Sequence, residues 1–375
     1  MIKTPEDIKK TINFYEESGF DGFSKKMLME CDEKFLFYFF SVLFEEASIC
    51  ECELSLEKWR ENLAFTNRNN ASFVFYYKLK KNKPQFMPPD EILGDLRSKY
   101  LSACCASLAS IRQLNELFSK FNEEKLSVIV FKGPALDQFL YPQQGLRVFS
   151  DIDLLVNPKQ YNLFHKAIGS LSYFSKYDSK IMKKIQELHI EETFYNKKNN
   201  YKAIDLHWSL NAYKGIFPKL KTKVFFEKSV EHNKIRIFDL IDTFISLSIH
   251  LLLTHENEIV FIRIYDLYLA LQKIIASGDV SELFERAAKN ETTVLIKKAI
   301  SLVLLWTDLE ISEDIQRNYN LNEYSKEEIK ILKYISKRHK NPFYWLKVRL
   351  PKDKNILSSL IMLIRYAICR KKYKL

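Results

Sequence analysis

The residues whose types and spacing best suit chemistry are two aspartates in the segment VFSDIDLLV, residues 148–156. Asp151 and Asp153 are separated by one apolar residue, and alternate residues of a β-strand point to the same face. Both carboxylates would then share one side of the strand, with Cα atoms about 6 to 7 Å apart. Carboxylates this close repel each other unless a cation binds there, and Mg²⁺ prefers such oxygen ligands. The pair predicts a site for divalent cations that act on phosphate groups.

A second segment, YKAIDLHWSL at residues 201–210, repeats this alternation. Asp205 and His207 would share one face, so Asp205 could add a third carboxylate from a neighbouring strand. His207 could orient an acid or pack beside Trp208. The interpretations without function are a solvated strand end for the aspartate pair and a hairpin-edge carboxylate for Asp205.

A turn upstream carries groups that suit phosphate. Gly133 follows the apolar run LSVIVF and precedes Pro134, a residue tolerated at a helix start, so backbone N–H groups there could bind an anion. Lys132 lies directly before this glycine. Arg147 could bind phosphate oxygens in a forked geometry, or form a salt bridge that orients Asp151. An ordinary strand-to-helix turn is the alternative for Gly133.

Three segments carry a resemblance to a known superfamily. FKGPALDQFLYP, GLRVFSDIDLLV and IDLHWSL resemble motifs of an uncharacterised branch of the polymerase-β-type nucleotidyltransferases, and the likeness covers about residues 100–275. Most of the superfamily has Gly or Ser where Pro134 stands here. Four downstream residues also stand at places that match the branch: His189, His250, His255 and Asp266.

The resemblance implies a short mixed sheet with helices and the Mg²⁺-dependent (or Mn²⁺-dependent) transfer of a nucleoside monophosphate from an NTP to an acceptor. It implies a metal pair in Asp151 and Asp153, a third acid in Asp205 that binds metal or deprotonates the acceptor, and a phosphate-turn glycine in Gly133. The further candidates for binding the nucleotide are Lys132, Arg147 and His207.

The other matching residues suit structural roles as well. His250 and His255 are five residues apart and miss the four-residue spacing of a helical metal pair, so a core or substrate-pocket role is favoured. Asp266 could be a helix-packing or capping acid, and His189 is expected to be structural.

A small sheet must position these groups. The apolar runs at 126–131 and 148–156 predict buried strands, the polar turn KKNN predicts a β-hairpin around it, and residues 90–124 predict one long helix. The expected fold class is α+β: a small mixed β-sheet with helices in an α/β core, flanked by helical regions. The expected division is an N-terminal helical region at 1–90, the core at 91–238 and a C-terminal helical region at 239–375.

Composition restricts the partners. The formal net charge is +11, which could suit nucleic acid, an anionic membrane or a phosphorylated substrate. Lysine is spread along the whole chain, however, so nucleic-acid binding is possible but not favoured. Six cysteines without a CxxC pair predict reduced thiols in a cytoplasmic protein. The apolar run at 356–369 contains Arg365 and is too short to span a bilayer, so a packed helix or a surface-seeking helix is expected there.

Three functional hypotheses follow from these observations. The first is a nucleotidyltransferase whose acceptor is a small molecule, a glycan, a peptide or a protein. The second is a toxin-like enzyme of the same chemistry that modifies tRNA or protein. The third is a non-catalytic nucleotide-binding or nucleic-acid-binding regulatory protein. Retention of three mutually repelling carboxylates favours the enzymes. Neither the acceptor, nor the preferred NTP, nor the oligomeric state follows from the sequence.

Overall fold

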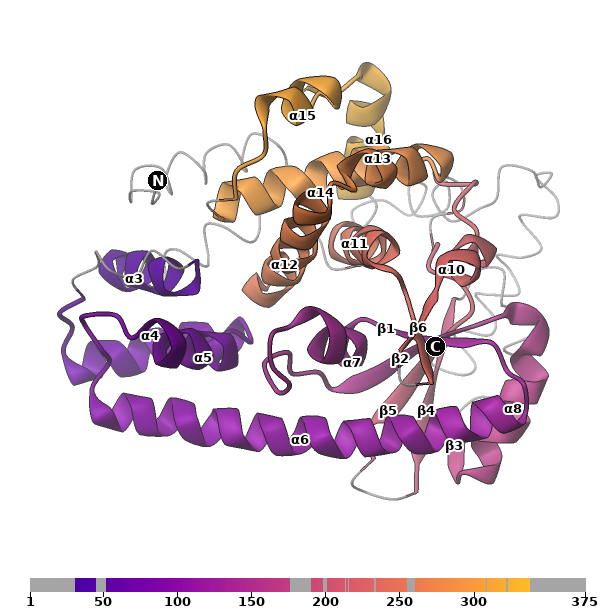
Figure 1. Ribbon diagram of the computed structural model, residues 1–375, viewed down its shortest axis with the longest axis horizontal. Helices are drawn as coiled ribbons and strands as arrows, with labels where there is room; N and C mark the ends of the chain where they lie inside the picture. Colours follow the sequence, from indigo (N-terminus) through magenta and orange to yellow (C-terminus); the bar gives the residue numbers. More distant parts are fainter. Residues whose placement is uncertain are drawn as a thin grey trace.

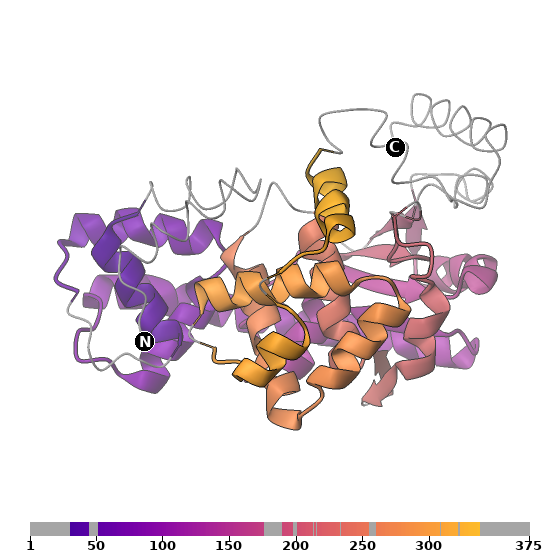
Figure 2. The ribbon, with the colours of Figure 1, turned by 90° about the horizontal axis from the view of Figure 1, so that it is seen from above.

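The computed structural model describes residues 31–44, 52–175, 190–197, 201–254 and 260–337, apart from residues 213, 215, 233, 308 and 322. A group of N-terminal helices lies at one end of the long axis and a seven-stranded sheet at the other (Figures 1 and 2). The helices that follow the sheet in the chain lie over the middle of the molecule. Helices combined with a mixed sheet confirm the predicted fold class.

Among the described residues, four helices precede the sheet: α3 (Glu33–Leu43), α4 (Leu56–Arg68), α5 (Ser72–Asn82) and α6 (Asp90–Glu123). Asp32 and Ser55 begin α3 and α4 by accepting a hydrogen bond from a backbone N–H of the first turn. The long helix predicted at 90–124 is confirmed by α6, which runs along one side of the molecule.

The sheet has the strand order β3-β4-β5-β2-β1-β7-β6. Its strands are β1 (Val128–Phe131), β2 (Asp151–Val156), β3 (Tyr173–Ser175), β4 (Glu191–Asn196), β5 (Ala203–His207), β6 (Val230–His232) and β7 (Ile235–Ile237). β4 and β5 form the predicted antiparallel hairpin, and β5 pairs in parallel with β2. The edge strands β3 and β6 and the strand β7 beside β6 were not predicted, because three residues are too few to display a periodic pattern.

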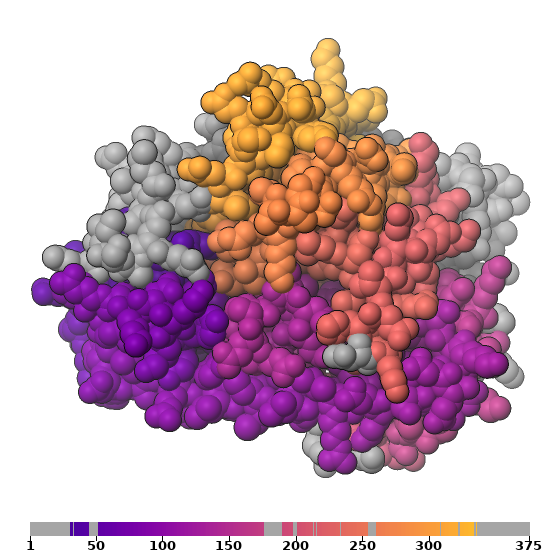
Figure 3. Space-filling view, viewed as in Figure 1, coloured from indigo at the N-terminus to yellow at the C-terminus, as the bar shows by residue number. Residues whose placement is uncertain are grey.

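The sheet separates two hydrophobic clusters. On one face, Ile152 and Leu154 pack with Phe118 of α6 and Phe164 of α8 (Tyr161–Ser170). On the other face, Leu155 belongs to the larger cluster formed with the helices that follow the sheet. Figure 3 shows α6 and these later helices on opposite sides of the molecule. Because side chains alternate along β2, its two aspartates lie on the face of Leu155.

Short helical segments connect the strands. β1 leads into α7 (Gly133–Ala135), which continues as the π-helix η1 (Leu136–Leu140). After β2, the Asn157 side chain accepts a hydrogen bond from the Lys159 N–H and so caps η2 (Pro158–Gln160), the 3₁₀ turn that precedes α8.

The helices after β5 are α10 (Thr222–Lys228), α11 (Leu240–Ile249), η3 (His250–Thr254), α12 (Phe261–Ser277), α13 (Val280–Lys289), α14 (Thr293–Trp306), α15 (Glu313–Asn318) and α16 (Lys326–Lys337). They share one core with the N-terminal helices: the ring of Phe261 lies 5.4 Å from that of Phe39, and the rings of Phe44 and Tyr268 are 4.9 Å apart. Within the described ranges, none of these helices has the length and apolarity needed to cross a membrane.

Candidate active site

Parallel pairing of β2 with β5 places the acidic residues side by side. Asp153 is the register partner of Asp205, and Leu155 is the partner of His207. Paired residues of neighbouring strands lie about 4.8 Å apart and share a face. Asp151 precedes Asp153 by two residues and shares that face too. The structure therefore brings together the three acids and the histidine singled out in the sequence.

Asp153 makes the strongest contacts in this group. Its side chain is 7% exposed, and the Lys132 ammonium donates a hydrogen bond of 2.7 Å to its Oδ1 atom. His207 Nε2 lies 3.0 Å from the same oxygen. Burial alone would raise the pKa of Asp153, but the positive charge of Lys132 and the contact with His207 outweigh it and lower the pKa to about 2. Asp153 is thus a carboxylate at neutral pH.

His207 lies between two acids. Its Nδ1 atom is 3.2 Å from the Oε2 atom of Glu191, the residue that pairs with it on β4. The Phe131 ring packs edge-on against the imidazole, with centroids 5.1 Å apart. Of the two roles predicted for His207, the orientation of an acid matches these contacts. Glu191 was not predicted, although its position in EETFYN, opposite the Asp-Leu-His segment of a predicted hairpin, would have placed it here.

The other two acids, Asp151 and Asp205, have raised pKa values. Burial raises the pKa of Asp151, and repulsion by Asp153 and Asp205 raises it further. Burial also raises the pKa of Asp205, with repulsion by Asp153 acting in the same direction. The Asp205 Oδ1 atom is buried and has no hydrogen-bond partner in the described part of the chain. A buried carboxylate oxygen without a donor has the capacity to accept a hydrogen bond from water or a ligand, or to coordinate an ion.

Lys132 has an unusual backbone conformation. Its φ of 53° and ψ of −134° fall in a region that favours glycine, yet the residue is a lysine. A conformation of this kind costs about 1–3 kcal/mol and is concentrated at functional sites. It ends β1 abruptly and lets the ammonium reach Asp153 on the neighbouring strand.

Gly133 lies against an aromatic ring. A Cβ atom at this position would approach the Cβ of Phe149 to 2.4 Å and its Cγ to 2.8 Å. The close contact with Phe149 is therefore a sufficient reason for glycine at the strand-to-helix turn. Phosphate binding by the backbone of this turn remains a prediction.

A second lysine lies beside the acids and was not predicted. The Lys202 ammonium donates a 2.6 Å hydrogen bond to the Phe149 carbonyl and lies 4.7 Å from the centre of the Phe149 ring. Burial lowers the pKa of Lys202, and the negative charge of Asp151 opposes that change. The sequence signal that could have indicated Lys202 is its position directly before β5, the strand that carries Asp205.

Arg147 does not contact Asp151 or the other two acids of the site. Its Nε atom donates to both carboxylate oxygens of Asp266 on α12, each at 2.9 Å, and its Nη1 donates to the Val148 carbonyl at 2.6 Å. The Tyr141 hydroxyl also donates to Asp266, at 2.7 Å. Burial raises the pKa of Asp266, and Arg147 and Tyr141 lower it. The Arg147–Asp266 ion pair thus connects the loop before β2 to α12.

Asp137, which the sequence did not single out, organises the same loop. It is 1% exposed, its Oδ1 accepts hydrogen bonds of 2.9 Å from the N–H groups of Gly145 and Arg147, and the Ser107 hydroxyl donates to its Oδ2. Gly145 has φ +87°, a conformation that suits glycine. A buried acid bound to loop N–H groups holds the chain that leads into β2.

Two of the remaining matching residues, His250 and Asp266, lie in the described part of the chain. His250 is the first residue of η3, and His189 and His255 lie outside the described residues, as does the apolar run at 356–369. Asp266 is a buried packing acid, as one of its interpretations holds. The predicted division into an N-terminal helical region, an α/β core and a C-terminal helical region stays a prediction.

The donor set fits a hard divalent cation. Asp151, Asp153 and Asp205 supply only carboxylate oxygens, one of them an orphaned buried oxygen, which matches the ligands of Mg²⁺ and Mn²⁺. Among the described residues, no three acidic, histidine or cysteine side chains are already arranged as a metal site. The Lys132 ammonium lies at Asp153, where a cation would otherwise balance the charge.

Comparisons with known proteins bear on this geometry. Residues 55–308 match the model of a family described as an uncharacterised nucleotidyltransferase, which is more than half of the chain. Searches of curated proteins and of solved structures found no match.

Proposed function

We propose, from the premise that this chain belongs to the uncharacterised nucleotidyltransferase family, that it transfers a nucleoside monophosphate from an NTP to an acceptor in a Mg²⁺- or Mn²⁺-dependent reaction. One observation carries the proposal: Asp151, Asp153 and Asp205 meet on one face of adjoining strands. Two of the three have a pKa raised by burial and mutual repulsion, an arrangement that is costly for the fold unless a cation binds.

The proposed reaction is an in-line displacement at the α-phosphorus. A hydroxyl or amine of the acceptor attacks this atom, the new bond to phosphorus forms, and the bond to the bridging oxygen breaks. Pyrophosphate leaves with that electron pair. The proton of the acceptor passes to Asp205, whose raised pKa suits a general base better than that of a fully solvated carboxylate.

Asp151 and Asp153 would hold the metal, and Asp205 would complete the site in those states in which it does not act as the base. When bound, the ion supplies positive charge that neutralises the phosphate oxygens and the developing charge on the leaving group. The chain contributes positioning: His207 fixes one oxygen of Asp153, and Glu191 fixes the opposite side of His207. Such preorganised contacts reduce the reorganisation needed during reaction.

Lys132 would change partners when nucleotide binds. In the absence of ligand its ammonium neutralises Asp153. A metal at Asp153 makes this ion pair unnecessary and releases Lys132 for the phosphate oxygens, together with Lys202 on the other side of the acids. The same ion pair would also suit a non-catalytic binding protein, so the experiment must distinguish catalysis from binding without catalysis.

The test is a thermal-shift measurement with each of the four NTPs, with and without Mg²⁺ or Mn²⁺. We expect at least one NTP to stabilise the wild-type chain only with metal, by about 2.7 kcal/mol at a hundred times its Kd. Asp153→Asn should abolish this shift while the chain stays folded. Asp314→Asn, a change at an exposed acid of α15, is the matched control and should retain it.

Transfer is then read as the release of pyrophosphate from the stabilising NTP. Equal nucleotide binding and turnover in wild type and Asp153→Asn would refute the metal assignment. Metal-dependent NTP binding without turnover on any class of acceptor would favour the non-catalytic regulatory protein. Turnover with tRNA or protein as the acceptor would favour the toxin-like enzyme.

A further inference from the structure

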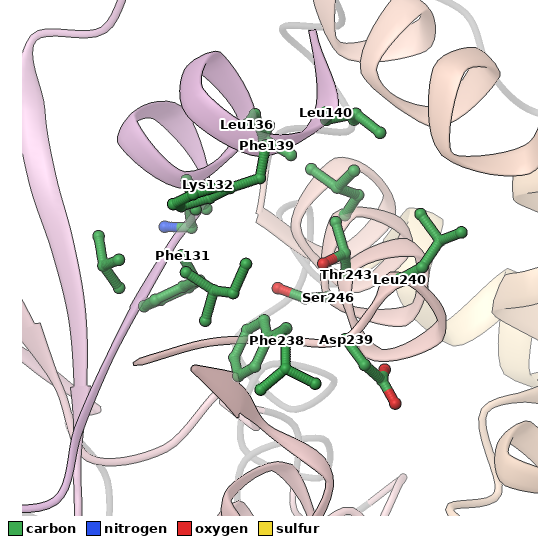
Figure 4. Close-up of a pocket in the computed structure, with 15 residues that line it drawn as sticks. Phe131, Lys132, Leu136, Phe139, Leu140, Phe238, Asp239, Leu240, Thr243 and Ser246 are labelled. Carbon is green, nitrogen blue, oxygen red and sulfur yellow. The ribbon is translucent and has the colours of Figure 1, made fainter. Parts of the chain in front are cut away.

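A cavity of about 250 Å³ lies next to the acidic site. It is enclosed by the end of β1, by η1, by the hairpin of β6 and β7, and by the first turns of α11 (Figure 4). β1 lies between β2, which carries the aspartates, and β7, which borders the cavity. The cavity and the acids are thus separated by about one strand spacing, roughly 5 Å.

Most of the cavity wall is apolar. Leu136 and Phe139 line it from η1, Phe238 closes it beyond β7, and Leu240 and Leu247 line it from α11. An engineered cavity of about 150 Å³ with a similar lining binds benzene. The larger volume here can take one aromatic ring or branched aliphatic group together with a short substituent.

Two hydroxyl groups enter this apolar space. Thr243 and Ser246 lie one turn apart on α11, and Figure 4 shows both oxygens directed toward the interior. Neither hydroxyl has a hydrogen-bond partner among the described residues, although Ser246 is only 5% exposed. Hydroxyls that face an otherwise apolar cavity without a protein partner are available to a polar substituent of a ligand.

The charged residues of the lining direct their charges elsewhere. Asp239 accepts from the Asp242 N–H at 2.8 Å and from Arg286 Nη1 at 2.5 Å. The stem of Lys132 forms part of the wall, while its ammonium binds Asp153. Lys132 therefore borders both the cavity and the acids. In the proposed reaction it contacts the phosphates, so a ligand in the cavity would end beside the reacting groups.

One wall is a π-helix. η1 closes over the cavity with Leu136, Phe139 and Leu140. π-Helical turns are rare, less stable than an α-helix of the same length, and frequent at functional sites. A wall of this type next to a free hydroxyl pair is a second sign that this region was shaped for a ligand.

We propose that this cavity binds the apolar part of the acceptor, an aromatic ring or branched aliphatic group, and presents an attached hydroxyl or amine to the acids past Lys132. The inference rests on the proposed function. A nucleobase fits less well, because its edge carries several polar atoms and the cavity offers two hydroxyls. Each polar atom of the base left without a partner would weaken binding.

The probe for this site is 4-ethylphenol, which joins an aromatic ring to one hydroxyl. Its binding to the full chain is measured by ligand-observed NMR in the absence of NTP and metal. We expect saturable binding. Ser246→Leu fills the cavity and should remove the binding, whereas Thr243→Val keeps the volume and should weaken it about two- to tenfold, the effect of one hydrogen bond.

A control on the same helix isolates the effect of the cavity. The Ser248 hydroxyl donates to the Phe244 carbonyl, and this residue does not line the cavity. Ser248→Ala should leave 4-ethylphenol binding unchanged, and Ser246→Ala should weaken it. Circular dichroism and the NTP thermal shift of each variant show that it is folded, and Thr243→Val and Ser246→Ala remain informative if Ser246→Leu does not fold.

Competition with the NTP distinguishes an acceptor site from a nucleobase site. We expect 4-ethylphenol and the stabilising NTP to bind together, and 4-ethylphenol, whose one hydroxyl is held by Thr243 and Ser246, to inhibit transfer to an acceptor. Displacement of 4-ethylphenol by the NTP would make the cavity a base site and overturn the inference, as would absence of binding or binding that Ser246→Leu leaves intact. If 4-ethylphenol binds as expected but no NTP binds with metal, the proposed function fails, and the acceptor assignment that rests on it fails with it.

Discussion

Asp153 is the residue at which the interactions of the site meet. Lys132 and His207 hold the same oxygen, and the carboxylate stays ionised at neutral pH because these partners outweigh burial. For Asp151 and Asp205, burial and repulsion between the acids outweigh the neighbours that favour the carboxylate, so their pKa values are raised. One acid of the three is therefore fixed by the chain, and the other two keep the freedom to bind a ligand.

Replacing Lys132 tests this balance. Lys132→Met removes the positive charge that opposes burial, so the pKa of Asp153 should rise from about 2. Asp153 stabilises the fold of the wild type above pH 4, and this contribution is lost as the pH falls toward 2. The measurement is a ¹³C NMR titration of the carboxyl group.

Lys159→Met, at an exposed position of η2, is the matched control and should leave that titration unchanged. A pKa of Asp153 that stays near 2 in Lys132→Met would show that His207 alone holds the carboxylate.

At the scale of elements, a buried ion pair joins the loop before β2 to α12. Arg147 is 14% exposed and Asp266 is fully buried. Removal of one partner leaves the other charge buried and unpaired. Arg147→Met should therefore destabilise the chain by about 3–5 kcal/mol, while Arg147→Met combined with Asp266→Leu should recover most of that loss. Urea unfolding of the two single variants and the double variant measures the coupling.

The same cycle decides between the two interpretations of Arg147. If the guanidinium bound phosphate instead, Arg147→Met would weaken NTP binding and leave the free energy of unfolding nearly unchanged. A recovered stability in the double variant would assign Arg147 to positioning.

The loop that carries Arg147 depends on Gly145. Its φ is +87°, and a Cβ atom there would lie 2.8 Å from the Cα of Cys104 on α6. Gly145→Ala should cost about 2 kcal/mol or more, since backbone strain adds to a clash with main-chain atoms. Gly94→Ala, at an exposed helical position with no atom within 4 Å, should instead stabilise by about 0.5–1 kcal/mol. Thermal unfolding of both variants provides the measurement, and equal destabilisation would contradict the account.

Elements with a long periodic pattern were predictable. The segment that forms α6, the strands that carry the aspartates and the β4–β5 hairpin all show such patterns, and the alternation of residues was enough to put Asp151, Asp153, Asp205 and His207 on one face. The partners of these residues were not predictable, because they depend on pairing between distant segments: Arg147 reaches Asp266 across 119 residues of sequence. The cavity between η1 and α11 depends on tertiary packing for the same reason.

At the scale of the whole molecule, the first and the last described helices share one hydrophobic core. The Phe261 ring on α12 contacts Phe39 and Phe40 of α3, and Phe40 lies 5.7 Å from Trp306 of α14. The helices of both ends should therefore unfold in one transition with the sheet between them.

Phe261→Ala tests this coupling. It should destabilise the chain by about 3–5 kcal/mol, and ¹⁹F-labelled Trp59 on α4 and Trp306 on α14 should lose their native signals at the same urea concentration. Phe174→Ala, at a half-exposed ring on β3, should change the midpoint little. Separate midpoints for the two tryptophans would show that the ends fold independently.

The contact between Gly133 and Phe149 has a consequence for the interpretation of related chains. Any side chain at 133 would collide with the aromatic ring, with or without a substrate. Evolution would thus retain a glycine here for reasons of space alone. The informative neighbour is Lys132: its glycine-like conformation is costly for a lysine, so we expect related chains that keep the proposed chemistry to keep a lysine here.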